Sequence, residues 1–586
     1  MLHRLELRWF EYAFVIREQQ IVLTSPIIQD SSFKIITKQP VKNHAEYMLN
    51  KIYKNCRARI FLFLLLIGWL GGLASARHSA PEFFSYAELT SLYEQEIVSQ
   101  PLESKLNRLL TTPFVDNSHA SATPLHFSHS SKLGDFMRVV QWNVERGLEY
   151  EAIEAAFKSE SQLAALLNEE KFPPQSEERR EALEQAAMLR QADVIILNEV
   201  DWGMKRTQYR HIAADLAEHL GMNYAFGVQF VELSPVQLSQ EPNRAGAVEN
   251  EVLNLVKVDP ARYKGLHGIA ILSRFPLENV RLVPFKYQPY DWYKSEKNGV
   301  SMLENGRRKI AEKVFLEKTL REVRRGGRAT LLADIADARL PNGRVTIIAT
   351  HLENRAKSAN RVKQLNELLG MVKEFNHPVV VAGDMNTSTE DLTPTTFRRE
   401  FKKRFGEPQY WIRKGICYAL GIGLIEDFVL DGMTFWRKHA DPTVRHIPLL
   451  APNSERKFFT TLENFRFADG GAFDFRGDSS RSVDEKTKTL SNSNERGSKG
   501  FVTTYQVNRP IKFVGKYKLD WIFVKPADLK KPTARNDSYR FAPHFGQTLT
   551  RINEVVEDRI SDHRPILVDL PLNEPPLDRE KVTGKN

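Results

Sequence analysis

From residue 136 onward, short apolar runs alternate with amphipathic stretches along most of the chain. Each run is bounded by polar turns and is almost continuously apolar, which is the pattern of strands buried on both faces. Strands are predicted at 137–144, 193–200, 224–230, 268–274, 329–335, 344–352, 377–385, 519–524 and 565–570. Apolar residues at i, i+3 and i+4 predict helices at 211–220 and 360–375. This alternation predicts a layered α/β fold in which helices cover the faces of sheets.

The most hydrophobic window of the chain lies near its N-terminus, at 60–73. A basic stretch precedes it and Ala74-Ser75-Ala76 follows, which is typical of a secretory signal peptide. The run is shorter than the ~20 residues that comfortably span a bilayer, which favours cleavage after Ala76 over a retained anchor or a buried core helix. We therefore expect the mature protein outside the cytoplasm, exported to a periplasm or secreted, or anchored to a membrane.

The rest of the chain divides by composition. A signal peptide would start at Met48, which makes the residues before it an upstream extension, or a cytoplasmic tail if the segment is an anchor. A helix is predicted at 85–110, in a stretch that otherwise resembles a stem. The expected parts are 1–47, an N-terminal extension; 48–76, the signal peptide or anchor; 77–135, a stem or linker; 136–572, the catalytic domain; and 573–586, a C-terminal tail.

Two stretches within the domain are predicted to be insertions. Residues 285–326 carry many Lys, Arg and Glu side chains in helical spacing, with Arg324, Arg325 and Arg328 near the end. Such a stretch is either a solvated helical face or a contact for an anionic substrate. Residues 469–500 are rich in Ser, Gly and charge, which predicts a flexible loop.

Composition limits the kinds of chemistry that the chain can carry. The only cysteines, Cys56 and Cys417, are too few for a disulfide scaffold or a thiolate zinc site. The 83 Lys and Arg residues exceed the 73 Asp and Glu residues, for a net charge of +10. That charge suits nucleic acid, phosphorylated lipid or an acidic membrane surface, but it is spread along the chain and equally serves solubility. The sequence gives no sign of a protein partner.

Polar residues gather where the predicted strands end, the place where α/β sheets present their functional side chains. These residues are Asn143, Glu199, His351, Asp384, Asn386, Asp520, Asp562 and His563. Each one alone has an ordinary interpretation as a turn, a helix N-cap or a hydrogen-bonded structural residue. The ordered set is informative because one reaction requires all of these residue types.

That reaction is the hydrolysis of a phosphate ester, which must neutralise phosphoryl charge, position a water and protonate the leaving oxygen. Glu199, Asp562 and Asn143 supply the oxygen ligands that Mg²⁺ or Mn²⁺ prefers, and no thiolate accompanies them. His351 and His563 can each give or take a proton near neutral pH. The set therefore indicates a metal-dependent hydrolase of phosphate esters.

The succession WNV, LNEVD, HGIAILSR, THLE, GDMN, LDWIF and SDHRP resembles the endonuclease/exonuclease/phosphatase superfamily, over about Phe136 to Leu572. This is the deoxyribonuclease-like fold of secreted nucleases, apurinic endonucleases, neutral sphingomyelinases and inositol polyphosphate 5-phosphatases. The resemblance implies a four-layered α/β/β/α sandwich of two packed mixed sheets flanked by helices, with the site at one edge of the sheets. The two insertions match no branch of the superfamily.

The resemblance also implies roles for single residues. Asn143 and Glu199 look like the amide and carboxylate nearest the metal ion, and Asp562 looks like the second carboxylate. Glu145 is expected to bind the ion through water.

The remaining residues match positions that act on the substrate. Asp384 resembles the residue that orients or deprotonates the attacking water, and Asn386 the one that holds a phosphoryl oxygen. His563 looks like the imidazole that stabilises the transition state, oriented by Asp520, and His351 resembles the second histidine, on the leaving-group side.

The substrate stays open at this point, because fold and reaction class do not fix it. The alternatives are a nuclease, a phospholipid phosphodiesterase of the sphingomyelinase kind, and a phosphatase of sugar or inositol phosphates. A nuclease predicts a basic groove along successive phosphates, and a lipid enzyme predicts an exposed apolar lip beside the site. A binding module that has lost its chemistry would lack ligands or histidines, and here all are present.

Overall fold

The structure is a computed structural model that describes residues 80–120, 126–242, 255–298, 322–387, 456–475, 503–511, 514–531, 540–557 and 559–573. The N-terminal extension, the apolar segment at 60–73 and most of the C-terminal tail lie outside these residues. So do 299–321 and 476–500, the larger parts of the two insertions. Among the residues that are described, no helix has the length and apolar character needed to cross a membrane.

The larger sheet has nine strands and carries one half of the candidate site. Its main path runs β1-β5-β8-β4-β3-β18-β17, while β10 pairs with β5 and β2 with β3. Only the β3–β4 pair is parallel, so the sheet is mixed. The strands are β1 (Phe114–Asp116), β2 (Ser128–Ser130), β3 (Gly134–Arg146), β4 (Val194–Trp202), β5 (Asn223–Glu232), β8 (Leu266–Ser273), β10 (Arg324–Gly326), β17 (His544–Thr548) and β18 (Ile566–Pro571).

A second sheet of five strands carries the other half, in the order β16-β13-β12-β11-β9. Its one parallel pair, β12–β13, is connected by helix α12 (Ser358–Val372). The strands are β9 (Glu278–Pro284), β11 (Ala329–Ala336), β12 (Arg344–His351), β13 (Val379–Asp384) and β16 (Asp520–Lys525). Two small hairpins complete the strands, β6 (Gln240–Pro242) with β7 (Leu255–Lys257) and β14 (Tyr505–Ile511) with β15 (Val514–Tyr517).

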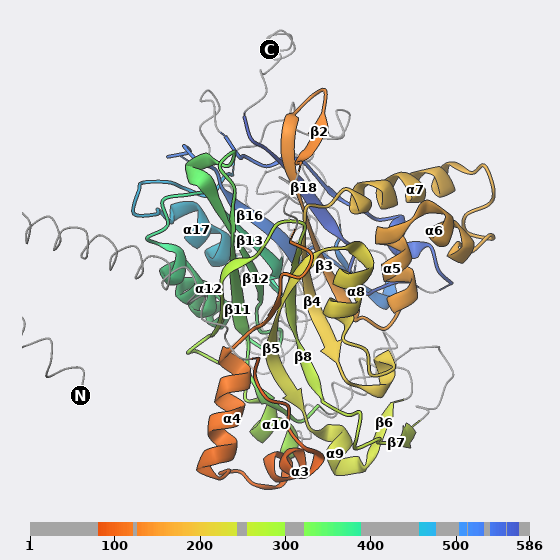
Figure 1. The fold of residues 1–586 in the computed structure, drawn as a ribbon, viewed down its shortest axis with the longest axis vertical. Helices are drawn as coiled ribbons and strands as arrows, with labels where there is room; N and C mark the ends of the chain where they lie inside the picture. Colours follow the sequence, from red (N-terminus) through yellow and green to blue (C-terminus); the bar gives the residue numbers. More distant parts are fainter. Residues whose placement is uncertain are drawn as a thin grey trace, which may run out of the picture. The chain divides into compact units, whose positions relative to one another are not determined.

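Alternation along the strands decides which side chains face which layer. In β4, Ile195 and Leu197 join the apolar cluster beneath the helices, while Val194 and Ile196 join the cluster formed by both sheets. Helices α5 (Tyr150–Lys158), α6 (Glu160–Leu166), α7 (Glu177–Arg190) and α8 (Ile212–Leu220) lie beside the nine-stranded sheet, and α12 and α17 (Arg456–Asn464) beside the other (Figure 1). The prediction of a mixed α/β fold is confirmed, and each strand and helix predicted from residue 136 onward is present within one or two residues.

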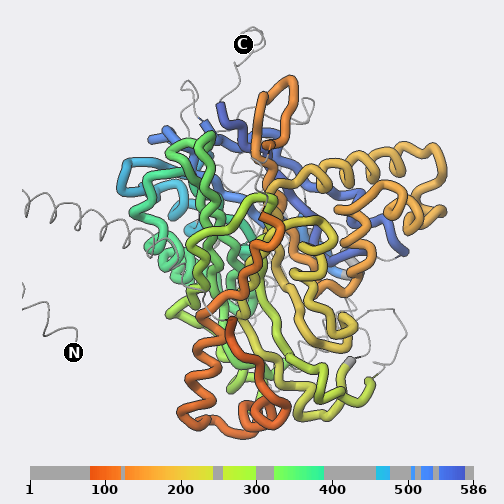
Figure 2. Tube along the Cα trace, viewed as in Figure 1, coloured from red at the N-terminus to blue at the C-terminus, as the bar shows by residue number. Residues whose placement is uncertain are grey.

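The stretch expected to form a stem carries secondary structure that packs on the sheets. Where one helix was predicted, there are two, α3 (Tyr86–Glu94) and α4 (Gln100–Thr111), because Pro101 begins a second helix at its first turn. Leu89 and Leu109 are fully buried in the cluster beneath the nine-stranded sheet. Figure 2 shows this red-orange segment beside the yellow-green part of the chain, where α3 contacts α9 (Ser234–Leu238).

Short helices close several turns around this framework. They are α10 (Trp292–Lys297) and the 3-10 helices η1 (Lys205–Thr207), η2 (Pro341–Gly343) and η5 (Ile552–Glu554). Of these, α10 lies in the basic stretch that was predicted to be an insertion, just before the residues that the structure leaves out.

Candidate active site

The two parallel strand pairs bring the polar strand ends together. Asn143 and Asn198 are register partners on β3 and β4, and His351 and Asp384 are partners on β12 and β13. Asp384 is also paired with Asp520, the first residue of the antiparallel strand β16. Because β13 packs against β3 and β4, the two pairs end at the same place. The site is therefore assembled from both sheets.

Asp384 lies at the centre of this cluster. Its Oδ2 is 3.4 Å from His351 Nε2 and 3.8 Å from His563 Nε2, and it accepts a hydrogen bond from Asn143 Nδ2 at 3.4 Å. Burial raises the pKa of Asp384 to about 7, opposed by the charge of His563 and reinforced by that of Asp520. A carboxyl group of this kind exchanges protons near neutral pH, as a general base requires.

His563 is held as a charged imidazole. Its Nδ1 lies 2.7 Å from Asp520 Oδ2, and Asp520 Oδ1 accepts a hydrogen bond from Gln141 Nε2 at 3.0 Å. Burial lowers the pKa of His563, but the nearby charges of Asp520 and Asp562 outweigh burial and raise it well above its usual value. The protonated ring therefore directs Nε2 toward the centre of the site, with Asp520 fixing its orientation.

His351 has the opposite electrostatic character. It is 1% exposed, and within the described chain neither of its ring nitrogens has a hydrogen-bond partner. Burial, followed by the charge of Arg328, lowers the pKa of His351 well below its usual value, so the ring is neutral. Its Nε2 also lies 4.0 Å from Glu199 Oε1. Two imidazoles in opposite charge states thus flank one carboxyl group.

Glu145 and Asp562 form a pair of carboxylates beside Asn143. The backbone N–H of Asp562 donates to Glu145 Oε2 at 2.9 Å, and Asn143 Oδ1 accepts from the N–H of Glu145 at 3.2 Å. Burial and the charge of Asp562 raise the pKa of Glu145 to about 7. The pair therefore holds more negative charge than its surroundings balance, a condition that a bound cation would relieve.

These donors fit a hard divalent cation by their chemistry. They are carboxylate and amide oxygens, and Mg²⁺ needs only one or two protein carboxylates because water and phosphate complete its coordination. In the part of the chain that the structure describes, no three carboxylate, imidazole or thiol groups are clustered as a ready-made ligand cage. Glu199 lies on the His351 side of the site and Asp562 on the His563 side.

Four residues of the site hold backbone conformations that disfavour side chains. Glu145, Arg146, Glu199 and Asn386 have φ values of 46°, 69°, 54° and 47°. The pairing of β3 with β4 shifts register between Asn143 and Arg146, and that of β4 with β8 shifts around Glu199. Bulges of this kind re-aim side chains at functional sites, and left-handed residues cost about 1–3 kcal/mol each. The strain is therefore concentrated where the polar residues meet.

All eight residues predicted from the sequence lie in or beside this cluster. Asn386 donates its backbone N–H to Asp384 Oδ1 at 2.8 Å, while its side-chain Nδ2 donates to the carbonyl of Leu352 at 3.0 Å. One of its amide hydrogens thus serves the loop after β13. His563 Nε2 lies 4.0 Å from Asp562 Oδ1, which connects the last of the eight residues to the group.

The most important residue that sequence reasoning missed is Asn198. Its Oδ1 accepts from the backbone N–H of Asp384 at 2.7 Å and from Gln141 Nε2 at 3.2 Å, and its Nδ2 donates to Thr350 O at 3.0 Å. A Cβ at Gly383 would lie 1.8 Å from Thr350 O, so only glycine allows this close approach. Asn198 and Gln141 are polar residues inside apolar strands, which is the signal that could have identified them.

Residues 140–563 match the model of the Endonuclease/Exonuclease/phosphatase family. No curated protein matches the chain at a significant level.

Among solved structures, an endonuclease/exonuclease/phosphatase from Beutenbergia cavernae DSM 12333 is 18% identical, with a TM-score of 0.34, over 75% of this chain and 73% of that one. The human Nocturnin catalytic domain with bound sulfate is 15% identical, with a TM-score of 0.30, over 74% and 92%. The 3'-5' exonuclease of Neisseria meningitidis is 13% identical, with a TM-score of 0.31, over 74% and 99%. At these levels the structures bear on neither substrate nor mechanism.

Replacing Asn198 with Ala should lower the free energy of unfolding by about 2–4 kcal/mol, because it leaves several buried polar groups without partners at about 1–3 kcal/mol each. Urea denaturation followed by circular dichroism would measure the change. Asn107→Ala, on the exposed face of α4, is the control and should stay within about 0.5 kcal/mol of the parent. A loss below 1 kcal/mol at Asn198 would contradict the role assigned to its side chain.

Proposed function

This chain belongs to the Endonuclease/Exonuclease/phosphatase family, whose members hydrolyse phosphate esters, and on that premise we propose that it cleaves phosphodiesters by direct attack of water on phosphorus. The observation that carries this proposal is the arrangement around Asp384, whose carboxyl group lies within 4 Å of a neutral and a charged imidazole. Such a centre offers a base, an electrostatic stabiliser and a proton donor for a single displacement.

In the proposed reaction, Asp384 accepts a proton from the attacking water as the new bond from oxygen to phosphorus forms. Its raised pKa suits this task, because a base works best with a pKa near the operating pH. The protonated His563, oriented by Asp520, donates a hydrogen bond to a non-bridging oxygen, where negative charge develops.

His351 is proposed to act on the leaving oxygen. Its ring is neutral in the protein alone, and an anionic phosphate bound beside it favours protonation of the ring. The bond from phosphorus to the leaving oxygen breaks as His351 gives this proton up. The two histidines therefore have separate tasks, which their opposite charge states support.

Members of the family generally use divalent metals, and we propose Mg²⁺ or Mn²⁺ here. Asn143, Glu199 and Asp562 would hold the ion, with Glu145 as a further oxygen donor. When bound, the ion neutralises charge on the phosphoryl oxygens. The raised pKa of Glu145 supports a cation next to the Glu145–Asp562 pair.

The proposal extends to where the protein acts. The basic, apolar and small-residue succession that ends at Ala76 supports a domain outside the cytoplasm, exported or held at a membrane surface. The net charge of +10 supports an anionic substrate, either nucleic acid or phospholipid.

Activity should disappear in excess EDTA and return on addition of Mg²⁺ or Mn²⁺. Glu199→Gln and Asp562→Asn should each raise the Mg²⁺ concentration for half-maximal rate by at least tenfold, because each removes a charged oxygen ligand. Titration of the metal against hydrolysis of bis(4-nitrophenyl) phosphate measures this. Full activity in excess chelator would exclude the proposed metal site.

The two histidines should respond differently to the leaving group. His563→Ala and His351→Ala should each lower kcat by roughly 10²–10⁴-fold on an alkyl phosphodiester, with smaller effects on KM. On a nitrophenyl ester, whose leaving oxygen needs no proton, His351→Ala should recover most of its rate and His563→Ala should not. Asp520→Asn should resemble a weaker His563→Ala, because Asp520 acts through that ring. Equal losses on both esters would overturn the division of tasks.

A further inference from the structure

The chain crosses from one sheet to the other immediately before Arg328. Gly326 ends β10 in the nine-stranded sheet, and Ala329 begins β11 in the five-stranded sheet. A Cβ at Gly326 would lie 2.2 Å from the carbonyl oxygen of Gln229, and one at Gly327 would lie 2.5 Å from the Gln288 side chain. The glycine pair allows this tight crossing, which places the Arg328 side chain in the interior near the end of β12.

The Arg328 guanidinium is buried without the partners that a buried guanidinium normally has. The residue is 2% exposed, and among the described residues its Nε and Nη1 find no hydrogen-bond acceptor. Its ion pair with Glu353 spans 3.5 Å from Nε to Oε2. The Glu353 carboxylate is already hydrogen-bonded, with Oε2 accepting from Trp292 Nε1 at 3.0 Å and Oε1 from the Arg355 N–H at 2.9 Å. Arg328 thus keeps donors available.

Two more arginines with an unsatisfied buried nitrogen lie on this side of the site. Arg146 and Arg324 both pair with Glu322, each at 2.5 Å, and the Nε of each lacks an acceptor in the described part of the chain. Arg146 follows the bulge that carries Glu145, and Arg324 lies two residues before Gly326. We name Arg146, Arg324 and Arg328 the arginine pocket.

The arginine pocket adjoins the catalytic centre. Arg328 is beside Glu353, which follows His351 by two residues, and the register of β11 with β12 pairs Thr330 with Thr350. The charge of Arg328 lowers the pKa of His351, and the charges of Arg146 and Arg328 lower that of Glu199 against the effect of burial. The unsatisfied donors of the pocket and of His351 therefore border one region.

We propose that the arginine pocket binds a second phosphoryl group of the substrate, next to the one that is attacked. This inference rests on the proposed function and narrows it to substrates with a further phosphate near the scissile bond. A guanidinium presents a planar fork of donors that matches phosphate oxygens, and it stays charged when buried. The scissile phosphate meets Asp384 and the two histidines, and its neighbour meets Arg328.

The cost of keeping Arg328 buried supports a ligand over a structural role. A buried charge with one loose ion pair does not recover its desolvation penalty, and unsatisfied buried donors cost about 1–3 kcal/mol or more. An arriving phosphoryl group supplies the missing acceptors and relieves that cost. The rings of Phe230 and Trp292 beneath Arg324, with centroids 5.5 and 5.0 Å from its Cζ, keep the pocket in shape without occupying its donors.

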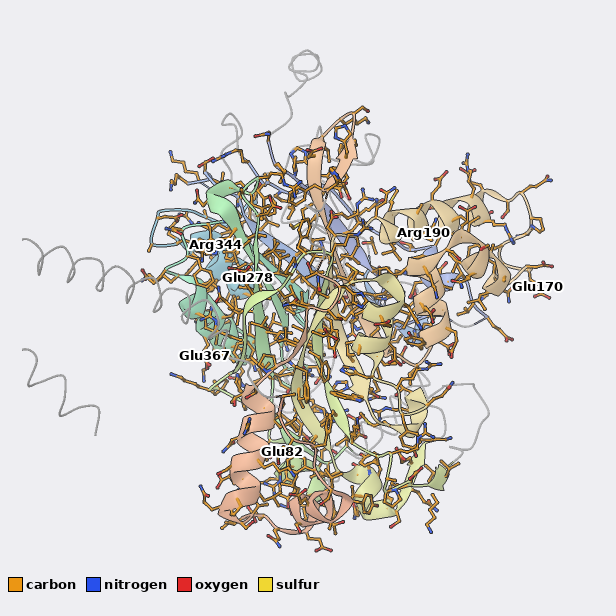
Figure 3. The ribbon with its side chains drawn as sticks, in the orientation of Figure 1. Glu82, Glu170, Arg190, Glu278, Arg344 and Glu367 are labelled. Carbon is orange, nitrogen blue, oxygen red and sulfur yellow. The ribbon has the colours of Figure 1, made fainter. Side chains whose placement is uncertain are left out.

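Calorimetric titration with inorganic phosphate and with inorganic pyrophosphate tests the proposal, in excess Mg²⁺ and again in EDTA. The wild-type protein should bind pyrophosphate at least tenfold more tightly than phosphate, and Arg328→Gln should reduce this ratio below threefold. Arg344→Gln is the matched control, because Arg344 is exposed at the opposite end of β12 from His351 (Figure 3). A ratio that Arg328→Gln leaves unchanged would overturn the proposal.

Binding and activity separate this inference from the proposed function. If the protein shows no phosphodiesterase activity but its pyrophosphate preference depends on Arg328, the proposed function fails and the pocket stands. If activity is present and the preference does not depend on Arg328, only the pocket fails.

Arg328→Met tests whether the side chain is structural. Its thermal unfolding midpoint should equal or exceed that of the wild type, because the lost ion pair is loose and buried. A fall of several degrees with an unchanged pyrophosphate preference would assign Arg328 a structural role and refute the pocket.

Discussion

The side chain of Asn198 connects the two sheets at the point on which the rest of the site depends. Through it, β4 in one sheet holds the backbone of Asp384 and Thr350 in the other. The apolar cluster between the sheets supplies most of the free energy of packing, but apolar contacts are non-directional and do not fix register. The hydrogen bonds of Asn198 do fix it, so the strand ends meet in one geometry and the reactive side chains reach one centre.

Once that geometry is set, differences in local charge give similar residues different tasks. His351 and His563 are both buried within 4 Å of Asp384, yet Asp520 keeps one ring protonated while burial and Arg328 keep the other neutral. Asp384 and Asp520 differ in the same way, because one contacts both rings and the other is hydrogen-bonded to a single ring and to Gln141. Function here follows from environment more than from residue type.

Much of this arrangement could be predicted from the sequence. Buried strands produce apolar runs that end in polar residues, so the strands and the eight polar residues were identified by pattern. The helix at 85–110 was predicted as one because a proline at the first turn of a helix reads as an interruption only when its context is known. The packing of α3 and α4 on the domain was not predicted, because their amphipathic pattern does not say which surface they cover.

Other features could not be derived from one sequence. The left-handed conformations of Glu145 and Glu199 arise from bulges that tertiary pairing imposes, and no local residue pattern marks them. Arg328 resembled one more charge at the end of a basic stretch, and its burial depends on the crossing between the two sheets. Long-range packing decided both.

The central claim is that water attacks phosphorus at a centre organised around Asp384. Hydrolysis of a phosphodiester in ¹⁸O-labelled water with Mg²⁺, followed by mass spectrometry of both products, tests it most directly. We expect one ¹⁸O atom per turnover in the phosphate-bearing product, none in the alcohol, and loss of this incorporation in Asp384→Asn. Label in the alcohol, or undiminished incorporation in Asp384→Asn, would contradict the account.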